Sequence, residues 1–297
     1  MKVLVIGLGQ MGLPIALNLR KAGHQVIGID VSPERRAEFE SAGGEAQDAI
    51  PRQSDADAAL TILASGAQVR AVYEGDRGLI TNMRQGSLLV DCSTIDIATA
   101  RDLQAAATQA GHDMIDAPVS GGVAAAAAGS LSIMIGGTEQ AFARARPLLA
   151  GIGQKIVHVG GAGAGLAAKL CNNLVVGATI GALSEAFALG ERLGVAADTL
   201  FEIMMASTGR SWALENVCPA PGPVPGAPSS NGYRPGGKTT ILLKDLDLAA
   251  QAARDAGVDA AINAAAADLY RRFSAAGGGD IDCTGVFTLL SGRLPPA

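Results

Sequence analysis

The first half of the chain alternates short apolar runs with segments of helical periodicity. The apolar runs are KVLVI at 2–6, QVIGI at 25–29, ALTIL at 59–63, SLLVD at 87–91 and DMID at 113–116. They are continuously apolar, as strands are when helices cover both faces of a parallel sheet. Further along, the pattern predicts a strand at 129–137, a helix at 139–149 and a strand at 155–159. It is typical of strand–helix–strand units on a parallel sheet.

After Gly160 the pattern changes to long helical segments. The first runs from about residue 161 to Leu193 and, as a helix, would extend over roughly 40 Å. We place a domain boundary near Gly163, which gives an α/β domain at 1–162 and an all-α domain at 163–297, joined by this long helix. The segment Pro219–Gly237 is rich in proline, glycine and serine, which suits either a linker or a binding loop inside the second domain.

Within the long helix, the stretch Cys171–Gly190 is almost apolar enough for a membrane span. Its Asn172, Asn173 and Glu185 would be costly in lipid, and no aromatic or basic belt flanks it. We therefore expect a buried helix and no membrane partner.

Composition and charge exclude other classes of protein. With 48% hydrophobic and 17% charged residues, the chain is too apolar to be disordered. Its net charge of −5, without a basic stripe, argues against a nucleic-acid partner. The four cysteines form no CxxC pair, and neither they nor the three histidines cluster at ligand spacing. We expect a reduced, cytoplasmic protein without a metal site.

A glycine-rich turn follows the first predicted strand. Gly7, Gly9 and Gly12 form GxGxxG after KVLVI, at the start of a helix predicted at about 11–22. The first glycine permits the tight bend, the second lets backbone amides approach a pyrophosphate, and the third lets the helix pack closely. The pattern predicts a Rossmann-type, doubly wound dinucleotide-binding domain, with cofactor contacts from Gly7, Leu8, Gly9, Gln10, Met11 and Gly12.

The second predicted strand ends in Asp30. A carboxylate here accepts hydrogen bonds from ribose hydroxyls and repels a 2′-phosphate, which favours NAD over NADP. Arg35 and Arg36 keep NADP open, because they lie at the start of the next helix within reach of a phosphate. The alternative for these arginines is a solvated charged turn.

Open α/β sheets bind ligands outside the carboxyl ends of their strands, where three loops are expected: 63–65, 92–95 and 117–122. In the third, Ser120 offers a hydroxyl, and Gly121 and Gly122 offer unobstructed backbone amides. Together these groups suit a carboxylate. The alternative is an ordinary glycine turn.

A dehydrogenase also needs a group that takes the hydroxyl proton as hydride moves to the cofactor. Lys169 lies in an otherwise apolar helix, where a charged side chain is disfavoured unless it is paired or functional. Burial would lower its pKa and make a neutral amine available as a base. Asn173 follows on the same helical face, one turn on. The alternative for Lys169 is a lysine that extends to the surface.

Together these motifs resemble those of the β-hydroxyacid dehydrogenase family. The matching stretches cover nearly the whole chain: GLGQMGLPIALNLRKAGHQV from Gly7, DCSTI from Asp91, DAPVSGG from Asp116, GSLSIMIGG from Gly129, GAGLAAKLCNN from Gly163 and KDLDLA from Lys244. The resemblance implies a Rossmann-type domain, a long interdomain helix and an all-helical domain, assembled as a homodimer or homotetramer.

The resemblance also implies roles for individual residues. Lys169 matches the catalytic lysine and Asn173 its substrate-orienting partner, with Asn172 adjacent. Ser120, Gly121 and Gly122 match the loop that holds the substrate carboxylate. At the cofactor, Leu63 and Ala64 match a contact loop, Thr94 matches the residue beside the nicotinamide, and Lys244 matches a second lysine there. The alternative for Lys244 is a helix-end lysine paired with Asp245 or Asp247, and we expect those two acids to form a solvated helix face.

The segment Ser211–Tyr233 resembles the branch of the family that acts on 3-hydroxyisobutyrate. The expected reaction is NAD-dependent oxidation of 3-hydroxyisobutyrate to methylmalonate semialdehyde, as in valine breakdown. Trp212 is then a candidate wall of the substrate pocket, with core packing as its alternative.

Two rival functions stay open. One is an NADPH-dependent reductase of a small semialdehyde, glyoxylate or imine, similar to tartronate semialdehyde reductases. The other is a cofactor-binding interaction module without catalysis. Two departures from the family pattern bear on substrate and cofactor: Ala64 stands where proline is common, and Gly237 stands where the branch usually has phenylalanine.

Overall fold

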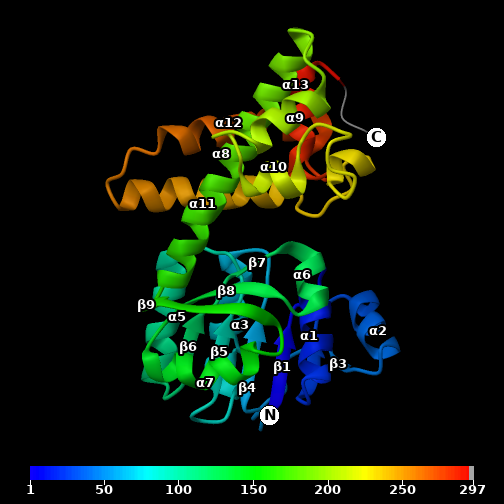
Figure 1. Cartoon of the computed structure of the whole chain (residues 1–297). Coiled ribbons are helices and arrows are strands. Elements are labelled where there is room, and N and C mark those ends of the chain that lie inside the picture. Colours follow the sequence, from blue (N-terminus) through cyan, green and yellow to red (C-terminus); the bar gives the residue numbers. More distant parts are fainter. Residues whose placement is uncertain (294–297) are drawn as a thin grey trace. The chain divides into compact units, whose positions relative to one another are not determined.

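The computed structural model describes residues 1–293 and divides into two compact units. The first unit comprises residues 1–169, and the second begins at Leu170. The change from one unit to the other falls inside a single helix, α8 (Ala164–Arg192) (Figure 1).

The first unit is built on a sheet that is parallel over six of its strands. The strands in the described part of the chain are β1 (Lys2–Ile6), β2 (Gln25–Ile29), β3 (Glu45–Gln47), β4 (Ala58–Thr61), β5 (Leu88–Asp91), β6 (Asp113–Asp116), β7 (Val119–Ser120), β8 (Leu131–Gly136) and β9 (Gly153–Gly160). The order β3-β2-β1-β4-β5-β6 runs in parallel register throughout. It reverses direction between β1 and β4, and such a switch point is where doubly wound sheets bind ligands.

The expectation of an entirely parallel sheet is wrong at the far edge. There β8 is antiparallel to both β6 and β7, while β9 is parallel to β8. β6 and β7 run in the same direction and pair with β8 in one register. The chain turns back between β7 and β8 through the short helix α6 (Gly122–Ala128), without the long crossover that a parallel neighbour requires. The sheet is therefore mixed.

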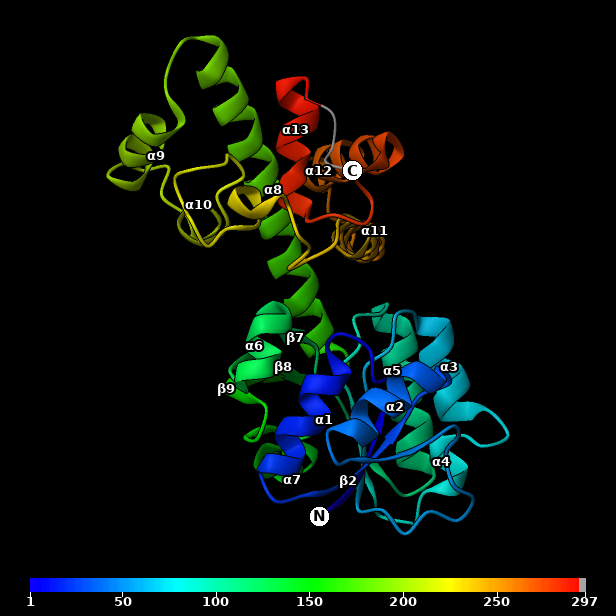
Figure 2. The same cartoon turned by 90° about the vertical axis from the view of Figure 1, so that its right-hand side faces the viewer.

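Helices cover both faces of this sheet, as the continuous apolar runs predict. They are α1 (Gly12–Lys21), α2 (Pro33–Ser41), α3 (Gly66–Glu74), α4 (Leu79–Asn82), α5 (Ile97–Gln109), α6 (Gly122–Ala128) and α7 (Glu139–Leu149). On one face, Val3 and Val5 pack with residues of α1, α6 and α7; on the other, Leu4 and Ile6 pack with residues of α3, α4 and α5. Figure 2 shows the two helical layers on either side of the strands.

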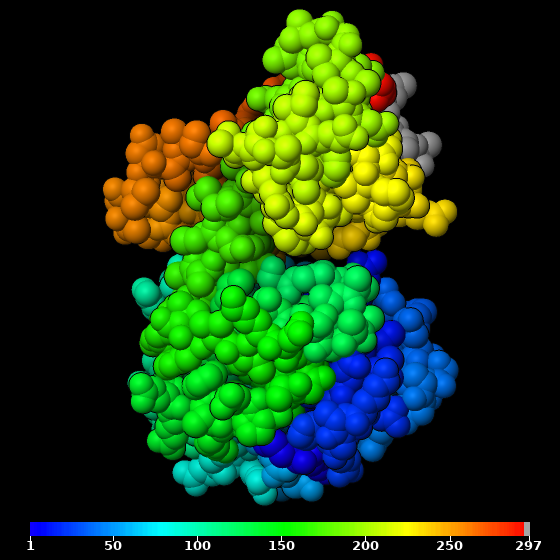
Figure 3. All heavy atoms as spheres, in the orientation of Figure 1, coloured from blue at the N-terminus to red at the C-terminus, as the bar shows by residue number. Residues whose placement is uncertain are grey.

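Two segments that are far apart in the sequence meet on one of these faces. The buried Asn18 of α1 donates its side-chain amide to the carbonyl of Ala126 in α6, at 2.7 Å. In Figure 3 the blue N-terminal segment and the green segments after residue 120 lie side by side on this surface. The contact fixes α6, and thus the loop that precedes it, against the first helix.

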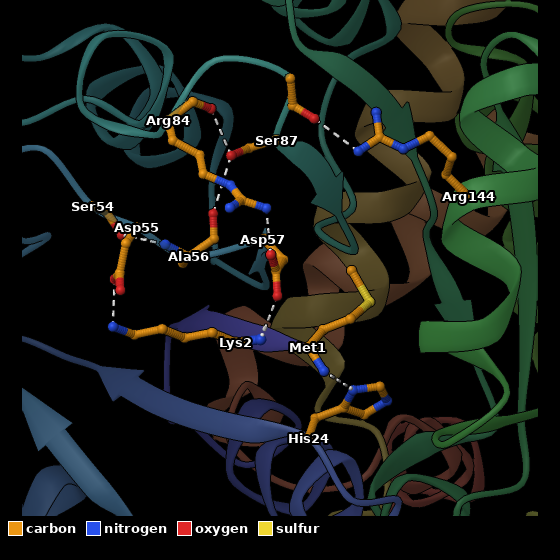
Figure 4. Close-up of polar contacts among 11 residues, drawn as sticks. Met1, Lys2, His24, Ser54, Asp55, Ala56, Asp57, Arg84, Ser87 and Arg144 are labelled. Carbon is orange, nitrogen blue, oxygen red and sulfur yellow. Dashed lines mark hydrogen bonds and ion pairs between the residues drawn. The ribbon is translucent and has the colours of Figure 1, made fainter.

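Ion pairs gather around the amino ends of β1 and β4 (Figure 4). Lys2 pairs with Asp55, and Arg84 lies 2.5 Å from Asp57, which also accepts the backbone N–H of Lys2 at 2.8 Å. Exposed pairs of this kind add little to stability and weaken as the salt concentration rises. They lie at the edge away from the carboxyl ends of the strands.

The second unit is helical. Its elements are the rest of α8, α9 (Ala197–Met205), α10 (Trp212–Val217), η1 (Pro228–Asn231), α11 (Thr239–Asp255), α12 (Ala261–Phe273), η2 (Ser274–Gly278), η3 (Cys283–Gly285) and α13 (Val286–Ser291). Within residues 1–293, α8 alone is long and apolar enough to cross a membrane by length and composition. Its Ile180, Leu183 and Phe187 are buried in the core of this unit, which fits the expected buried helix.

The proline-rich segment before α11 is an ordered loop of the second unit. The buried Tyr233 donates its hydroxyl to the carbonyl of Pro219, at 3.1 Å, which closes the loop on itself. The buried Ser229 donates to the carbonyl of Cys218 at 2.6 Å. Of the two interpretations left open by the sequence, a linker is wrong and a loop inside the second unit is correct.

Candidate functional site

The glycine turn after β1 holds its shape through two of its three glycines. Gly7 has a positive φ of 96°, and its N–H donates to the carbonyl of Ile29 at 2.8 Å. A Cβ on Gly12 would lie 2.8 Å from the Gly7 carbonyl carbon and closer still to its oxygen. A Cβ on Gly9, by contrast, would meet nothing within 4 Å. Protein packing therefore explains Gly7 and Gly12, and the open space at Gly9 suits a ligand that approaches the backbone, as a dinucleotide pyrophosphate does.

Asp30 lies at the end of β2, beside this turn. Its carboxylate accepts the N–H of Leu8 at 2.7 Å and that of Ser32 at 2.9 Å. Arg36 turns back to donate to the carbonyl of Asp30 at 2.7 Å, and Arg35 pairs with Glu38 at 2.9 Å. Both arginines thus have protein partners, as the solvated-turn interpretation expects.

Gln10 is exposed and Met11 half-buried, between the glycines of the turn. The loops after β4 and β5 lie beside each other at the same edge of the sheet. The backbone N–H of Leu63 donates to the hydroxyl of Ser93 at 2.9 Å, which joins the two loops. Thr94 is half-buried next to this link.

At the position where the family commonly has proline, the N–H of Ala64 donates to the side chain of Gln68 at 3.1 Å. Proline has no N–H to give, so the departure adds a hydrogen bond to the loop.

The Ser120 loop requires glycine for conformational reasons. Gly121 and Gly122 have φ values of 126° and 69°, a region that other residues rarely adopt. Ser120 is half-buried and pairs with Ser132 of β8. The backbone thus accounts for both glycines, and carboxylate binding by this loop stays a prediction.

Lys169 is fixed to the sheet by a buried carboxylate at the end of β6. One oxygen of Asp116 accepts from Gly163 N–H (2.8 Å) and from Gln104 (2.7 Å), and the other accepts from Leu166 N–H (2.8 Å). These bonds hold the first turn of α8, one turn before Lys169. The lysine is only 8% exposed, so the surface-lysine interpretation is wrong.

Asn173, one turn on, belongs to a polar chain inside the second unit. It donates its amide to Asp245 of α11 at 2.6 Å and accepts from the exposed Asn172 at 3.1 Å. Lys244 lies 3.3 Å from the other oxygen of Asp245. The pairing with Asp245 that was the alternative for Lys244 is found, although the lysine lies inside α11 and not at its end. Its role near the nicotinamide stays a prediction.

The sequence analysis missed Asp245, which is 3% exposed and not part of a solvated face. Asp247 alone is solvent-facing, paired with Arg271 at 3.1 Å. A signal was present, because Asp245 falls in line with the buried Leu242, Leu246 and Ala249 on the apolar stripe of α11. An acid on such a stripe indicates a buried partner.

Two other predicted pocket residues lie in the second unit. Trp212, at the start of α10, is 62% exposed, so its core-packing alternative is wrong. The N–H groups of Gly236 and Gly237 each donate to the buried carboxylate of Asp282 at 2.9 Å. A Cβ on Gly237 would meet nothing within 4 Å.

Comparison with known proteins identifies the family. Residues 2–160 match the family model described as the NAD binding domain of 6-phosphogluconate dehydrogenase. Residues 163–290 match the model described as NAD-binding of NADP-dependent 3-hydroxyisobutyrate dehydrogenase. The chain belongs to the β-hydroxyacid dehydrogenase family. This confirms the resemblance seen in the sequence and the Rossmann-like and helical domains it implied.

Relatives of this family member cover nearly its whole length. A probable 3-hydroxyisobutyrate dehydrogenase of Mycobacterium tuberculosis is 41% identical over 97% of each chain. The 3-hydroxyisobutyrate dehydrogenase of Pseudomonas aeruginosa is 41% identical over 89% of each. A solved structure of the M. tuberculosis enzyme with L-serine superimposes with a TM-score of 0.92 at 40% identity, over 97% of this chain and 98% of that one. The protein is an NAD-dependent oxidoreductase that acts on a hydroxyl group.

Proposed function

We propose that this dehydrogenase oxidises 3-hydroxyisobutyrate to methylmalonate semialdehyde, with Lys169 as the general base. The observation that carries the assignment of the base is a lysine buried in an apolar helix and fixed at the sheet edge through Asp116. The residues of the glycine turn and Asp30 would hold NAD, which would supply the acceptor for the hydride from the carbinol carbon of the substrate. Lys169 Nζ takes the hydroxyl proton, so one alcohol yields one aldehyde, one NADH and one proton.

Asn173 would orient the substrate hydroxyl beside this amine. Its amide has two N–H donors, one of which Asp245 occupies. Asp245 thereby sets the orientation in which the second N–H is presented. Asn172 donates its side-chain amide to the Asn173 side-chain oxygen, which fixes the orientation of Asn173 further.

The substrate carboxylate would bind to the hydroxyl of Ser120 and the backbone amides of Gly121 and Gly122. Both glycines have a positive φ, and successive backbone N–H groups in such turns can face an anion. The exposed Trp212 would form an apolar wall for the methyl group of the substrate. L-serine, named with the solved M. tuberculosis enzyme, is also a short 3-hydroxy acid.

The cofactor residues divide between two halves of the sheet. Gly7–Gly12 and Asp30 would hold the pyrophosphate and the adenosine ribose on the side of β1 and β2. Leu63, Ala64 and Thr94, after β4 and β5, would contact the nicotinamide half. Lys244 would supply a positive charge near it.

The deciding experiment measures initial rates at 340 nm with NAD and, separately, NADP. The substrates are 3-hydroxyisobutyrate, 3-hydroxypropionate, glycerate and serine. We expect the highest kcat/KM with 3-hydroxyisobutyrate and NAD. Turnover with NADP alone would instead support the reductase, and NAD binding without any turnover would support the interaction module.

Exchange of Lys169 for alanine tests the base. General-base catalysis contributes about 10² to 10⁴ in rate, so K169A should lose at least about 10²-fold in kcat while it still binds NADH. K155A, which removes an exposed lysine of β9, is the matched control and should keep its activity. If K169A keeps most of its activity, Lys169 is not the base.

We also propose that the protein is a cytoplasmic homodimer or homotetramer. Leu189, Leu193 and Ile203 of the second unit are 59%, 71% and 54% exposed, and burying these apolar side chains against a second copy would be favourable. The four cysteines are all free, which fits a reducing compartment. Light scattering coupled to size-exclusion chromatography tests the assembly, and a mass of 29.8 kDa would contradict it.

A further inference from the structure

A buried polar chain lies beneath the carboxyl ends of β4 and β5. Thr61 and Asp91 are register partners on these two strands. The Thr61 hydroxyl lies 2.7 Å from Asp91 Oδ1 and 3.1 Å from the hydroxyl of Tyr73 on α3. Asp91 Oδ1 also accepts the backbone N–H of Ser93 at 3.1 Å. Asp91 is 1% exposed, and Thr61 and Tyr73 are fully buried.

The carboxylate decides the direction of every bond in this chain. An ionised carboxylate only accepts, so Thr61 donates to Asp91. The single hydroxyl proton of Thr61 is then used, and Tyr73 must donate to Thr61. Asp91 Oδ2 is buried and makes no hydrogen bond within the described residues. The whole chain is thus oriented toward one carboxylate.

Such a carboxylate is costly to keep inside a domain. Burial, with a smaller effect from the negative charge of Asp116 on the neighbouring strand, raises the pKa of Asp91 to about 6, although the hydrogen bonds from Ser93 and Thr61 act to lower it. Cys92 and Tyr73, the other titratable groups that face it, have pKa values raised by burial and by Asp91 itself. The apolar core on this face does not require a charge here.

The position of these hydrogen-bonded side chains indicates which loops the Asp91 carboxylate supports. Ser93, whose N–H Asp91 holds, accepts the N–H of Leu63 on its own hydroxyl at 2.9 Å. Asp91 therefore fixes both loops. It holds the loop after β5 through the N–H of Ser93, and it holds the loop after β4 through Thr61 and through the bond from Leu63 to Ser93. These loops lie on the far side of the switch point from the glycine turn and Asp30.

We propose that Asp91 is a positioning residue that holds the Leu63 and Ser93 loops in place for the nicotinamide half of the cofactor. This inference rests on the proposed function. It implies that loss of these hydrogen bonds weakens binding of the whole dinucleotide. A ligand that contains only the adenosine half, which would bind on the side of β1 and β2, should bind as before.

The test compares the affinity for NADH with that for ADP, a probe of the adenosine half alone, by titration calorimetry. D91A leaves the Thr61 and Ser93 donors without an acceptor and should weaken NADH binding about 10- to 100-fold. S93A removes only the acceptor for Leu63 N–H, and D91N keeps an acceptor oxygen but no charge; each should weaken NADH binding about 3- to 10-fold. ADP binding should change less than about twofold in all three.

D96A is the matched control, because Asp96 lies in the same segment and only caps α5, through Thr99 N–H at 2.7 Å. It should leave the ratio of the two affinities unchanged. Equal weakening of NADH and ADP would make Asp91 a general structural residue, and unchanged NADH binding in D91N and S93A would overturn the proposal even if D91A does not fold. Failure of the proposed function is distinguishable, because the wild type itself would then not turn over 3-hydroxyisobutyrate.

Discussion

Replacing Gly12 by alanine should lower the stability of the protein, whereas replacing Gly9 by alanine should lower its affinity for NADH, although both glycines belong to the same turn. A Cβ on Gly12 lies 2.8 Å from the Gly7 carbonyl carbon and 3.0 Å from the Ile62 side chain. Carbon atoms pack at about 3.5 to 4.0 Å, so the backbone of the turn must move by roughly 1 Å. Overpacking of this kind costs about 3 kcal/mol when the obstacle is backbone.

That cost predicts a measurable loss of stability. For a domain of this size, 1 kcal/mol lowers the melting temperature by about 2 to 4 °C, so G12A should melt about 6 to 12 °C below the wild type. Because its added methyl group meets only open space, G9A should melt within about 2 °C of the wild type and lose NADH affinity at least about tenfold.

Thermal unfolding followed by circular dichroism and NADH titration separate the two effects. A G12A variant with wild-type stability would refute the packing argument. A G9A variant with wild-type affinity would refute the assignment of the open space at Gly9 to the cofactor.

Three further predictions follow from contacts in the two units. N173A should lower kcat by about 10²-fold with little change in NADH affinity, because we propose that Asn173 orients the substrate and does not contact the cofactor; steady-state kinetics and titration check this. G237F should melt within about 2 °C of the wild type, because Gly237 is exposed and its added Cβ would meet nothing within 4 Å, and it should change KM for short hydroxy acids; a large loss of stability would contradict it. The pKa of Asp91 is raised to about 6 from 3.8, so its native state binds the proton more tightly than the unfolded state. Its contribution to stability is therefore present at low pH and lost as pH rises through that window, by on the order of 3 kcal/mol. Melting temperatures of the wild type should fall relative to those of D91N between about pH 4 and 6.

Local patterns in the sequence were enough to predict most elements of the first unit. Runs such as KVLVI form strands because both faces are covered, and Gly7 and Gly12 form the predicted turn because close approach leaves no room for a side chain there. The short strands β3 and β7 were not predictable, and neither was the antiparallel direction of β8, which was itself predicted as a strand, because each depends on pairing across the sheet.

The site was predictable where one residue contrasts with its neighbours and not where two distant residues meet. Lys169 stands out as a charge in an apolar helix, and its burial agrees with that contrast. The pairing of Thr61 with Asp91 and that of Asn173 with Asp245 join residues far apart in the sequence. Only the register of β4 with β5 and the packing of α11 bring them together.

The three backbone and side-chain donors held by Asp116 have a mechanical meaning. Because the first turn of α8 is bonded to the end of β6, Lys169 is carried as a part of the cofactor-binding unit. Bending of the chain beyond residue 169 would leave the first turn of α8 bonded to the end of β6. Under the proposed function, the proton acceptor and the cofactor would share one frame, and a motion that admits the substrate would not need to disturb their alignment.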